Sequence, residues 1–262
     1  MSLFCGADSI DTLYLGDTEV EKAYVGSELV YTKEQPTPEP ENCLKLVSES
    51  SNTMTLNQVG TPPTVNLEYS LNGSTWTAWD YANGGVTWTG ALYLRGHDNT
   101  GFASSTSVYN NFAFTSSVAI YGNIMYLLEY DETLTAIPAT YCFCNLFNRC
   151  TSLTTTPALP ATTLELSCYR SMFYGCTSLT TAPALPATTL VGYCYYYMFY
   201  GCSSLTLLPK VSATDISANN CLSNWLSNVP ANGTIHIAEG MSSVYPSGAS
   251  GIPSGWTVVE DA

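Results

Sequence analysis

A 26-residue unit repeats in the carboxyl-terminal half of this chain, and it constrains the fold more than any other feature. Two copies align without a gap, CTSLTTTPALPATTLELSCYRSMFYG at 150–175 and CTSLTTAPALPATTLVGYCYYYMFYG at 176–201. A shortened copy precedes them, and another begins at Cys202 and then diverges. A unit this short cannot enclose a core of its own, so successive copies must stack and share one. The sequence therefore predicts a solenoid over residues 122–262, whose final segments GTIHIAEG and GWTVVE form a cap.

Comparison of the copies separates core positions from surface positions. Apolar residues four positions apart predict a short helix with one buried stripe in each copy. The aligned stripes are Leu164, Cys168 and Met172 in one copy and Leu190, Cys194 and Met198 in the next. Three further rows are expected to be buried: Phe147, Phe173 and Phe199; Cys150, Cys176 and Cys202; and Leu153, Leu179 and Leu205.

Positions that change between copies are expected to face solvent. One pair of positions holds Cys144-Asn145, then Arg170-Ser171, then Tyr196-Tyr197, and another segment holds Glu165-Leu166-Ser167, then Val191-Gly192-Tyr193. This predicts an exposed patch of Tyr193, Tyr196, Tyr197 and Arg170 as the candidate ligand-binding site. Exposed tyrosines offer rigid contact area with a hydroxyl at the tip, which suits sugars or another protein. The alternative is that these rings pack against the adjacent turn or against another subunit.

The cysteines repeat with the copies as well. Three pairs share a C-x7-C spacing: Cys142 and Cys150, Cys168 and Cys176, and Cys194 and Cys202. Zinc sites usually contain closer cysteine pairs together with further ligands. We therefore expect buried structural thiols, ahead of disulfides and of metal ligands, and no cofactor.

The amino-terminal half divides into three segments. Residues 1–33 contain a ten-residue echo, IDTLYLGDTE followed by VEKAYVGSEL, which predicts a small three-stranded β-meander that attaches the chain to another subunit or domain. Residues 34–42 alternate proline and glutamate, as semi-rigid linkers do. Residues 43–121 predict about seven strands in an Ig-like β-sandwich, with LEYSLNGSTWTAWD as the best hairpin. Its tryptophans, Trp76, Trp79 and Trp88, favour the core over a ligand surface. The fold class is thus mainly β with short helices.

Charge and motifs exclude several classes of function. With 21 acidic and 7 basic side chains the formal net charge is −14, which disfavours nucleic acid and anionic membranes as partners. The chain lacks the run of about 18 apolar residues that a membrane span requires, and it begins without a secretory signal pattern. The sequence contains no phosphate-binding glycine loop, nucleophile elbow or zinc-protease motif. His97, beside Asp98, and His236 are not tied to a nucleophile by any motif, so we do not expect an enzyme.

The unit CTSLTTAPALPATTL, followed by CYYYMFYGC, resembles the BspA-like leucine-rich repeats of bacterial surface proteins. That resemblance covers about residues 122–262. It implies a right-handed solenoid of short strands and helices, a cell-surface location and a link to adhesion. YSLNGSTWTAWD and GIPSGWTVV resemble domains that accompany such repeats in gut Bacteroides proteins and their phages, and YLGDTEVEKAYVGSELVY resembles a segment of phage virion proteins.

These resemblances lead to one expectation and two alternatives. The expectation is a non-enzymatic modular protein of a phage virion, a tail or fibre component that binds a host-surface glycan or protein. Residues 1–33 would hold it to other virion subunits or to copies of itself. Because surface members of the family carry export signals and this chain shows none, a bacterial cell-surface adhesin is the first alternative. A purely structural spacer is the second.

Overall fold

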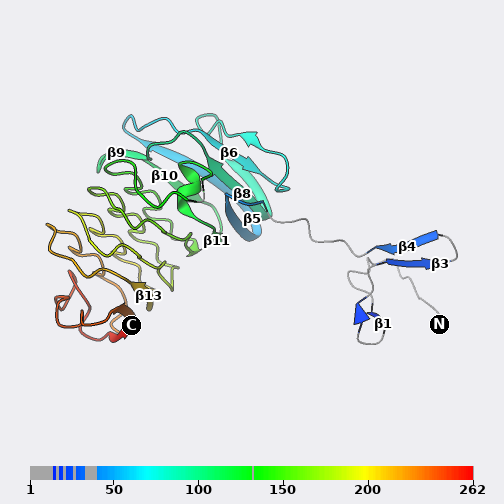
Figure 1. Ribbon diagram of the computed structural model, residues 1–262. Coiled ribbons are helices and arrows are strands. Elements are labelled where there is room, and N and C mark those ends of the chain that lie inside the picture. The colour runs from blue at the N-terminus through cyan, green and yellow to red at the C-terminus, as the bar shows by residue number, and fades with distance from the viewer. Residues whose placement is uncertain are drawn as a thin grey trace. The chain divides into compact units, whose positions relative to one another are not determined.

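The computed structural model describes residues 40–131 and 133–261 and, before them, the backbone of four short strands (Figure 1). The chain divides into two compact units, Met1–Glu39 and Pro40–Ala262. The division falls inside the Pro/Glu linker predicted at 34–42, of which residues 34–39 lie outside the described residues.

The first unit contains two strand pairs. β1 (Tyr14–Leu15) pairs with β2 (Thr18–Glu19), and β3 (Lys22–Val25) pairs with β4 (Glu28–Thr32), both antiparallel. These described strands form two separate two-stranded sheets instead of the predicted three-stranded meander. The physical reason lies in the ten-residue echo, which places Tyr14 in β1 and the aligned Tyr24 in β3. One period of the echo therefore corresponds to a strand pair and not to a single strand.

The second unit begins with the seven strands predicted for residues 43–121. They are β5 (Leu44–Val59), β6 (Leu67–Ser70), β7 (Thr77–Ala78), β8 (Val86–Gly96), β9 (Ala103–Ser105), β10 (Val108–Phe114) and β11 (Val118–Tyr121). The predicted hairpin is confirmed, since β6 and β7 pair antiparallel around Asn72-Gly73. All seven belong to a single eight-stranded sheet that also includes β12 (Leu153–Thr155). The Ig-like arrangement remains a prediction.

The long strand β5 organises this sheet. Its residues Lys45–Val47 pair with β11 and its residues Met54–Val59 pair with β10, so both neighbours share one edge of β5. Asn52 lies buried where β10 gives way to β11. Its side-chain amide donates to the Ser116 carbonyl at 2.9 Å, and its oxygen accepts from the Ser116 amide at 3.1 Å. One asparagine thereby satisfies the backbone at the corner between the two strands.

Two of the three tryptophans are core residues, as expected. Trp79 and Trp88 are buried, and the indole of Trp79 donates to the Gly84 carbonyl at 3.0 Å. Trp76 is only partly buried, and the guanidinium of Arg95 lies 3.9 Å from its ring.

The sheet continues directly into the repeats. β11 pairs in parallel with β12, which belongs to the first full-length copy. The Phe112 amide donates to the Leu146 carbonyl at 2.8 Å, and the Cys150 thiol donates to the Phe112 carbonyl at 2.8 Å. The sheet and the repeats consequently share one hydrophobic core, and β10 and β11 cover the first end of the stacked copies (Figure 1).

Successive copies lie side by side and are joined by backbone hydrogen bonds (Figure 1). The amide of Phe147 donates to Met172, that of Phe173 to Met198 and that of Phe199 to Trp225, each at 3.0 Å. After the last full copy, β13 (Leu207–Val211), β14 (Thr234–Ala238) and β15 (Thr257–Asp261) form a parallel three-stranded sheet. The segments predicted as a cap are thus the last two strands of this stack.

Every row that the repeat alignment predicts to be buried is buried, including the four-residue stripes.

The predicted helices are wrong. The described part of the chain holds one short helix, the 3-10 helix η1 (Ile124–Leu127), outside the aligned copies. The fold is mainly β with almost no helix.

The stripes arise instead from consecutive four-residue turns. Arg170, Met172 and Tyr174 donate their amides to the carbonyl three residues back, whereas the alternate amides, such as that of Ser171, donate to the next copy. Ser167 and Ser171 have positive φ, 57° and 53°, which an α-helix does not contain. A turn that returns every fourth residue buries the same positions as one helix face, so the spacing alone does not distinguish the two.

Candidate functional site

The turns determine which residues of YCYYYMFYGC face inward. Cys194, Tyr195, Met198 and Phe199 are buried, whereas Tyr193, Tyr196 and Tyr197 are partly exposed. Tyr193 and Tyr197 have positive φ, 57° and 55°, like the aligned Ser167 and Ser171. The backbone conformation is therefore repeated between copies, and the tyrosine side chains are what the later copy adds.

The four predicted site residues lie together, and we call them the tyrosine patch. The rings of Tyr196 and Tyr197 are 4.4 Å apart at 70°, and those of Tyr193 and Tyr196 are 5.5 Å apart. The Arg170 guanidinium, one copy earlier, lies 4.3 Å from the Tyr196 ring centroid and 5.5 Å from that of Tyr193. A hydrogen bond with Tyr196 raises the pKa of Tyr197. The patch combines a cation, ring surfaces and hydroxyls.

Two tyrosines that the sequence comparison did not single out extend this surface. Tyr174 and Tyr200 are partly exposed and occupy the same position in successive copies, with stacked rings 4.8 Å apart. The ring of Tyr200 also lies 5.1 Å from that of Tyr197. The four-residue period could have found them, because Tyr200 follows Tyr196 by four residues. The comparison of copies does not mark them as exposed, because both copies carry the same MFYG segment and only positions that change between copies are expected to face solvent.

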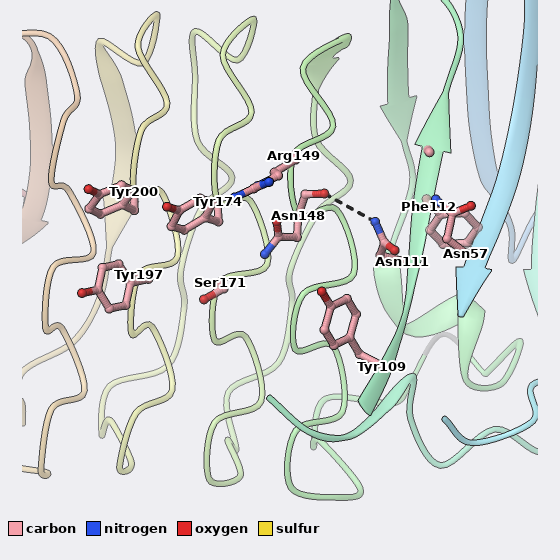
Figure 2. Close-up of a pocket in the computed structure, with 11 residues that line it drawn as sticks. Asn57, Tyr109, Asn111, Phe112, Asn148, Arg149, Ser171, Tyr174, Tyr197 and Tyr200 are labelled. Carbon is pink, nitrogen blue, oxygen red and sulfur yellow. Dashed lines mark hydrogen bonds between the residues drawn. The ribbon is translucent and has the colours of Figure 1, made fainter. Parts of the chain in front are cut away.

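A groove of about 730 Å³ opens between strands β5 and β10 and the copies beside them (Figure 2). Its lining consists of Asn57, Tyr109, Asn111, Phe112, Ala113, Asn148, Arg149, Ser171, Tyr174, Tyr197 and Tyr200. This set shares only Tyr197 with the tyrosine patch. The groove has the volume of a small-molecule site and is lined by aromatic rings, amides and one arginine.

The expectation of solvent exposure fails at the first of the aligned pairs. Cys144 and Asn145 are buried, while Arg170-Ser171 and Tyr196-Tyr197 are partly exposed. The reason is the connection between β9 and β10, which covers the first copy: the Asn145 amide nitrogen donates to the Thr106 carbonyl at 3.3 Å. Ser167 is buried as well, although its position was expected to face solvent.

The cysteines line the interior of the stack. The eight cysteines of the stack, from Cys142 to Cys221, are free and buried. The thiols of Cys150, Cys176 and Cys202 donate to carbonyls of Phe112, Phe147 and Phe173 at 2.8, 3.2 and 3.1 Å. Burial raises the pKa of Cys150 and of Cys202 to about 12. These groups remain neutral thiols at physiological pH, so they act as core residues and not as nucleophiles.

Each histidine contacts one carboxylate. His97 Nδ1 lies 3.2 Å from Asp98 Oδ2, and His236 Nδ1 lies 3.0 Å from Asp261 Oδ1 in the terminal strands. Over residues 40–131 and 133–261, no group of His, Cys, Asp and Glu side chains is arranged to hold a metal ion. In the same ranges, no helix has the length and apolarity needed to cross a bilayer.

No family model, curated protein or solved structure matches this chain.

Proposed function

We propose that this chain is a non-enzymatic modular binding protein whose tyrosine patch recognises a glycan or a protein on a bacterial surface. The observation that carries the proposal is the position of Arg170 over Tyr196 and Tyr193, in two adjacent copies. A guanidinium over partly exposed rings contributes about 0.5–1 kcal/mol and fixes the patch in one geometry. Rigid tyrosines lose little entropy when a partner binds, which is why they suit recognition surfaces.

The wider architecture that fits this function is also part of the proposal. Residues 122–262 form a solenoid of the BspA-like leucine-rich-repeat type, and residues 43–121 form an Ig-like domain that holds it. The first unit attaches the chain to other subunits of a phage tail or fibre. Many copies on one particle convert weak contacts into tight binding. What supports this arrangement is the shared core of the sheet and the stacked copies, which would present the patch on a stiff body.

The test is binding of fluorescently labelled protein, displayed multivalently, to a panel of intact gut bacteria. The variant carries Tyr193→Ser and Tyr197→Ser. Serine already occupies the aligned positions 167 and 171 at positive φ, so this variant is expected to fold normally. Tyr121→Ser is the matched control, because Tyr121 is a tyrosine 49% exposed on strand β11, outside the patch.

We expect strain-selective binding by the wild type and by Tyr121→Ser, and its loss in the double variant. Binding that survives the double variant would move recognition to another surface. No binding of the wild type to any strain would favour the spacer, in which the tyrosines only pack between subunits.

A further inference from the structure

The groove beside the tyrosine patch has a lining that repeats along the stack. Asn148, Tyr174 and Tyr200 occupy one position in three successive copies (Figure 2). The rings of Tyr174 and Tyr200 are stacked at 4.8 Å with planes 6° apart. The row therefore passes from two phenol rings, with their hydroxyls, to an amide. A hexose ring offers both apolar C–H faces and hydroxyls, and such a row can contact both.

Amide groups form the opposite side of the groove. Asn57 of β5 and Asn111 of β10 are direct cross-strand partners. The Asn111 amide nitrogen donates to the Asn148 backbone carbonyl at 3.5 Å (Figure 2). The Asn148 side-chain amide nitrogen donates to Asn145 Oδ1 at 2.7 Å. These bonds orient the side chains of Asn111 and Asn148. The side-chain oxygen Oδ1 of each accepts no hydrogen bond from any described residue. Oriented amides can accept from, and donate to, neighbouring hydroxyls of a sugar.

Arg149 is the charged member of the lining, and its contacts leave the guanidinium available. It is exposed, and none of the carboxylates in the described ranges forms an ion pair with it. Its stem lies beside Gly175, where an added Cβ would be 3.6 Å from Arg149 Cγ. Arg170, by contrast, is occupied by the tyrosine rings. The groove lining contains no Asp or Glu.

We propose that this groove binds a sugar unit that carries a carboxylate, a uronic or sialic acid within an acidic glycan. Arg149 pairs with the carboxylate, the amides bind ring hydroxyls, and the tyrosine row contacts the ring. Arginine is suited to this because its planar fork matches a carboxylate in two parallel hydrogen bonds. The inference goes beyond the proposed function, because it assigns a ligand class to a second site that shares only Tyr197 with the tyrosine patch.

The net charge of −14 does not oppose this assignment at close range. At physiological ionic strength the Debye length is about 8 Å, so acidic groups farther away are largely screened. The charge that a bound carboxylate meets first is that of Arg149.

The test uses the full chain and two matched pairs of probes. Tetragalacturonate and 3′-sialyllactose are each compared with their methyl esters by isothermal titration calorimetry or ligand-observed NMR. Arg149→Gln removes the cation and keeps a long, unbranched side chain at a position with φ of 61°. Lys210→Gln makes the same change in net charge on β13, away from the groove.

We expect at least one acidic probe to bind the wild type about tenfold more tightly than its uncharged partner. That preference should disappear in Arg149→Gln and persist in Lys210→Gln. Equal binding of charged and uncharged probes, no binding of either acidic probe, or a preference that survives Arg149→Gln overturns the proposal. Loss of the preference in Lys210→Gln to the same extent also overturns it, because net charge alone would then be responsible.

The two proposals fail separately. The single variant Tyr193→Ser alters the tyrosine patch but not the groove, whereas Arg149→Gln alters the groove but not the patch. If binding to bacteria is lost in Tyr193→Ser and unchanged in Arg149→Gln, the proposed function stands and the acidic-glycan groove is wrong. If the acidic probes bind through Arg149 but no bacterium is bound, the groove stands and the proposed function is wrong.

Discussion

The ring of Phe147 lies 5.7 Å from the ring of Phe173, and the two planes differ by 1°. Phe173 lies at the same distance from Phe199, at 6°. All three are fully buried, one in each copy. The interior of the stack therefore contains a continuous column of phenylalanines, and each inner ring is covered on both faces. Packing within this column and the backbone hydrogen bonds both stabilise the contact between neighbouring copies.

Phe173→Ala is expected to destabilise the protein strongly, because it opens a cavity in the middle of the column. Large-to-small changes of buried phenylalanine cost about 3–5 kcal/mol in the free energy of unfolding. Urea unfolding followed by circular dichroism measures the change, and Phe173→Leu, which refills part of the space, should cost less. A loss below about 1 kcal/mol for Phe173→Ala would mean that the column does not support the stack.

Substitutions of Ser171 distinguish the turns from a helix. At its φ of 53° glycine is favoured over alanine, so Ser171→Gly should be more stable than Ser171→Ala by about 1 kcal/mol. A helix predicts the reverse order, because glycine costs about 1 kcal/mol relative to alanine inside a helix. Unfolding free energies of the two variants decide between them. At Ser203, whose φ is not positive, glycine should have no such advantage.

Tyr169→Phe is expected to stabilise the protein. The Tyr169 hydroxyl is buried without a hydrogen-bond partner, and the aligned residue of the preceding copy, Phe143, stacks on its ring at 5.9 Å. Removing an unpaired buried hydroxyl should raise the unfolding free energy by about 1 kcal/mol. Tyr245→Phe is the control, since that hydroxyl donates to the Ala213 carbonyl at 3.2 Å and its loss should destabilise. Equal destabilisation by Tyr169→Phe and Tyr245→Phe would contradict the conclusion that the Tyr169 hydroxyl has no hydrogen-bond partner.

Stability should fall at alkaline pH because of the buried thiols. Burial raises the pKa of Cys202 to about 12 in the folded protein, whereas an exposed thiol titrates near about 8.5. Between these values the unfolded chain releases the proton and the folded chain keeps it. The contribution of Cys202 to the free energy of unfolding is thus complete below pH about 8.5. It is lost as the pH rises above that value, by up to about 1.4 kcal/mol per pH unit.

Urea unfolding of the wild type at pH 8 and pH 10, beside Cys202→Ala, measures this effect. The free energy of unfolding should decrease less between pH 8 and pH 10 in Cys202→Ala than in the wild type. An equal decrease of the free energy of unfolding in both proteins would show that Cys202 does not keep its proton in the folded state. In native protein below pH 8 the eight cysteines from Cys142 to Cys221 should also react slowly with an aromatic disulfide reagent, and quickly once urea unfolds the chain.

The buried rows that are shared by the aligned copies could be predicted from the sequence alone, because a stack of copies forces the same positions inward in each one. The burial of Cys144, Asn145 and Ser167 could not. The rows of Phe173, Cys176 and Leu179 and the gathering of Tyr193, Tyr196 and Tyr197 on one face follow from alignment alone. The hairpin at Asn72-Gly73 also follows from local turn chemistry, since that dipeptide favours the tight turn between two alternating runs.

The choice between helix and turn in the copies depends on long-range hydrogen bonds, which become visible in the folded chain. A four-residue spacing buries Leu164, Cys168 and Met172 in either case, and the choice depends on where the backbone amides find their acceptors. For alternate residues the acceptor lies about one copy away along the chain, as from Phe173 to Met198, a pairing that no local pattern reveals. The groove could not be predicted from the sequence for the same reason. Asn57 and Asn111 face Asn148 and Tyr174 only because the sheet packs on the first copy, through contacts between residues far apart in sequence.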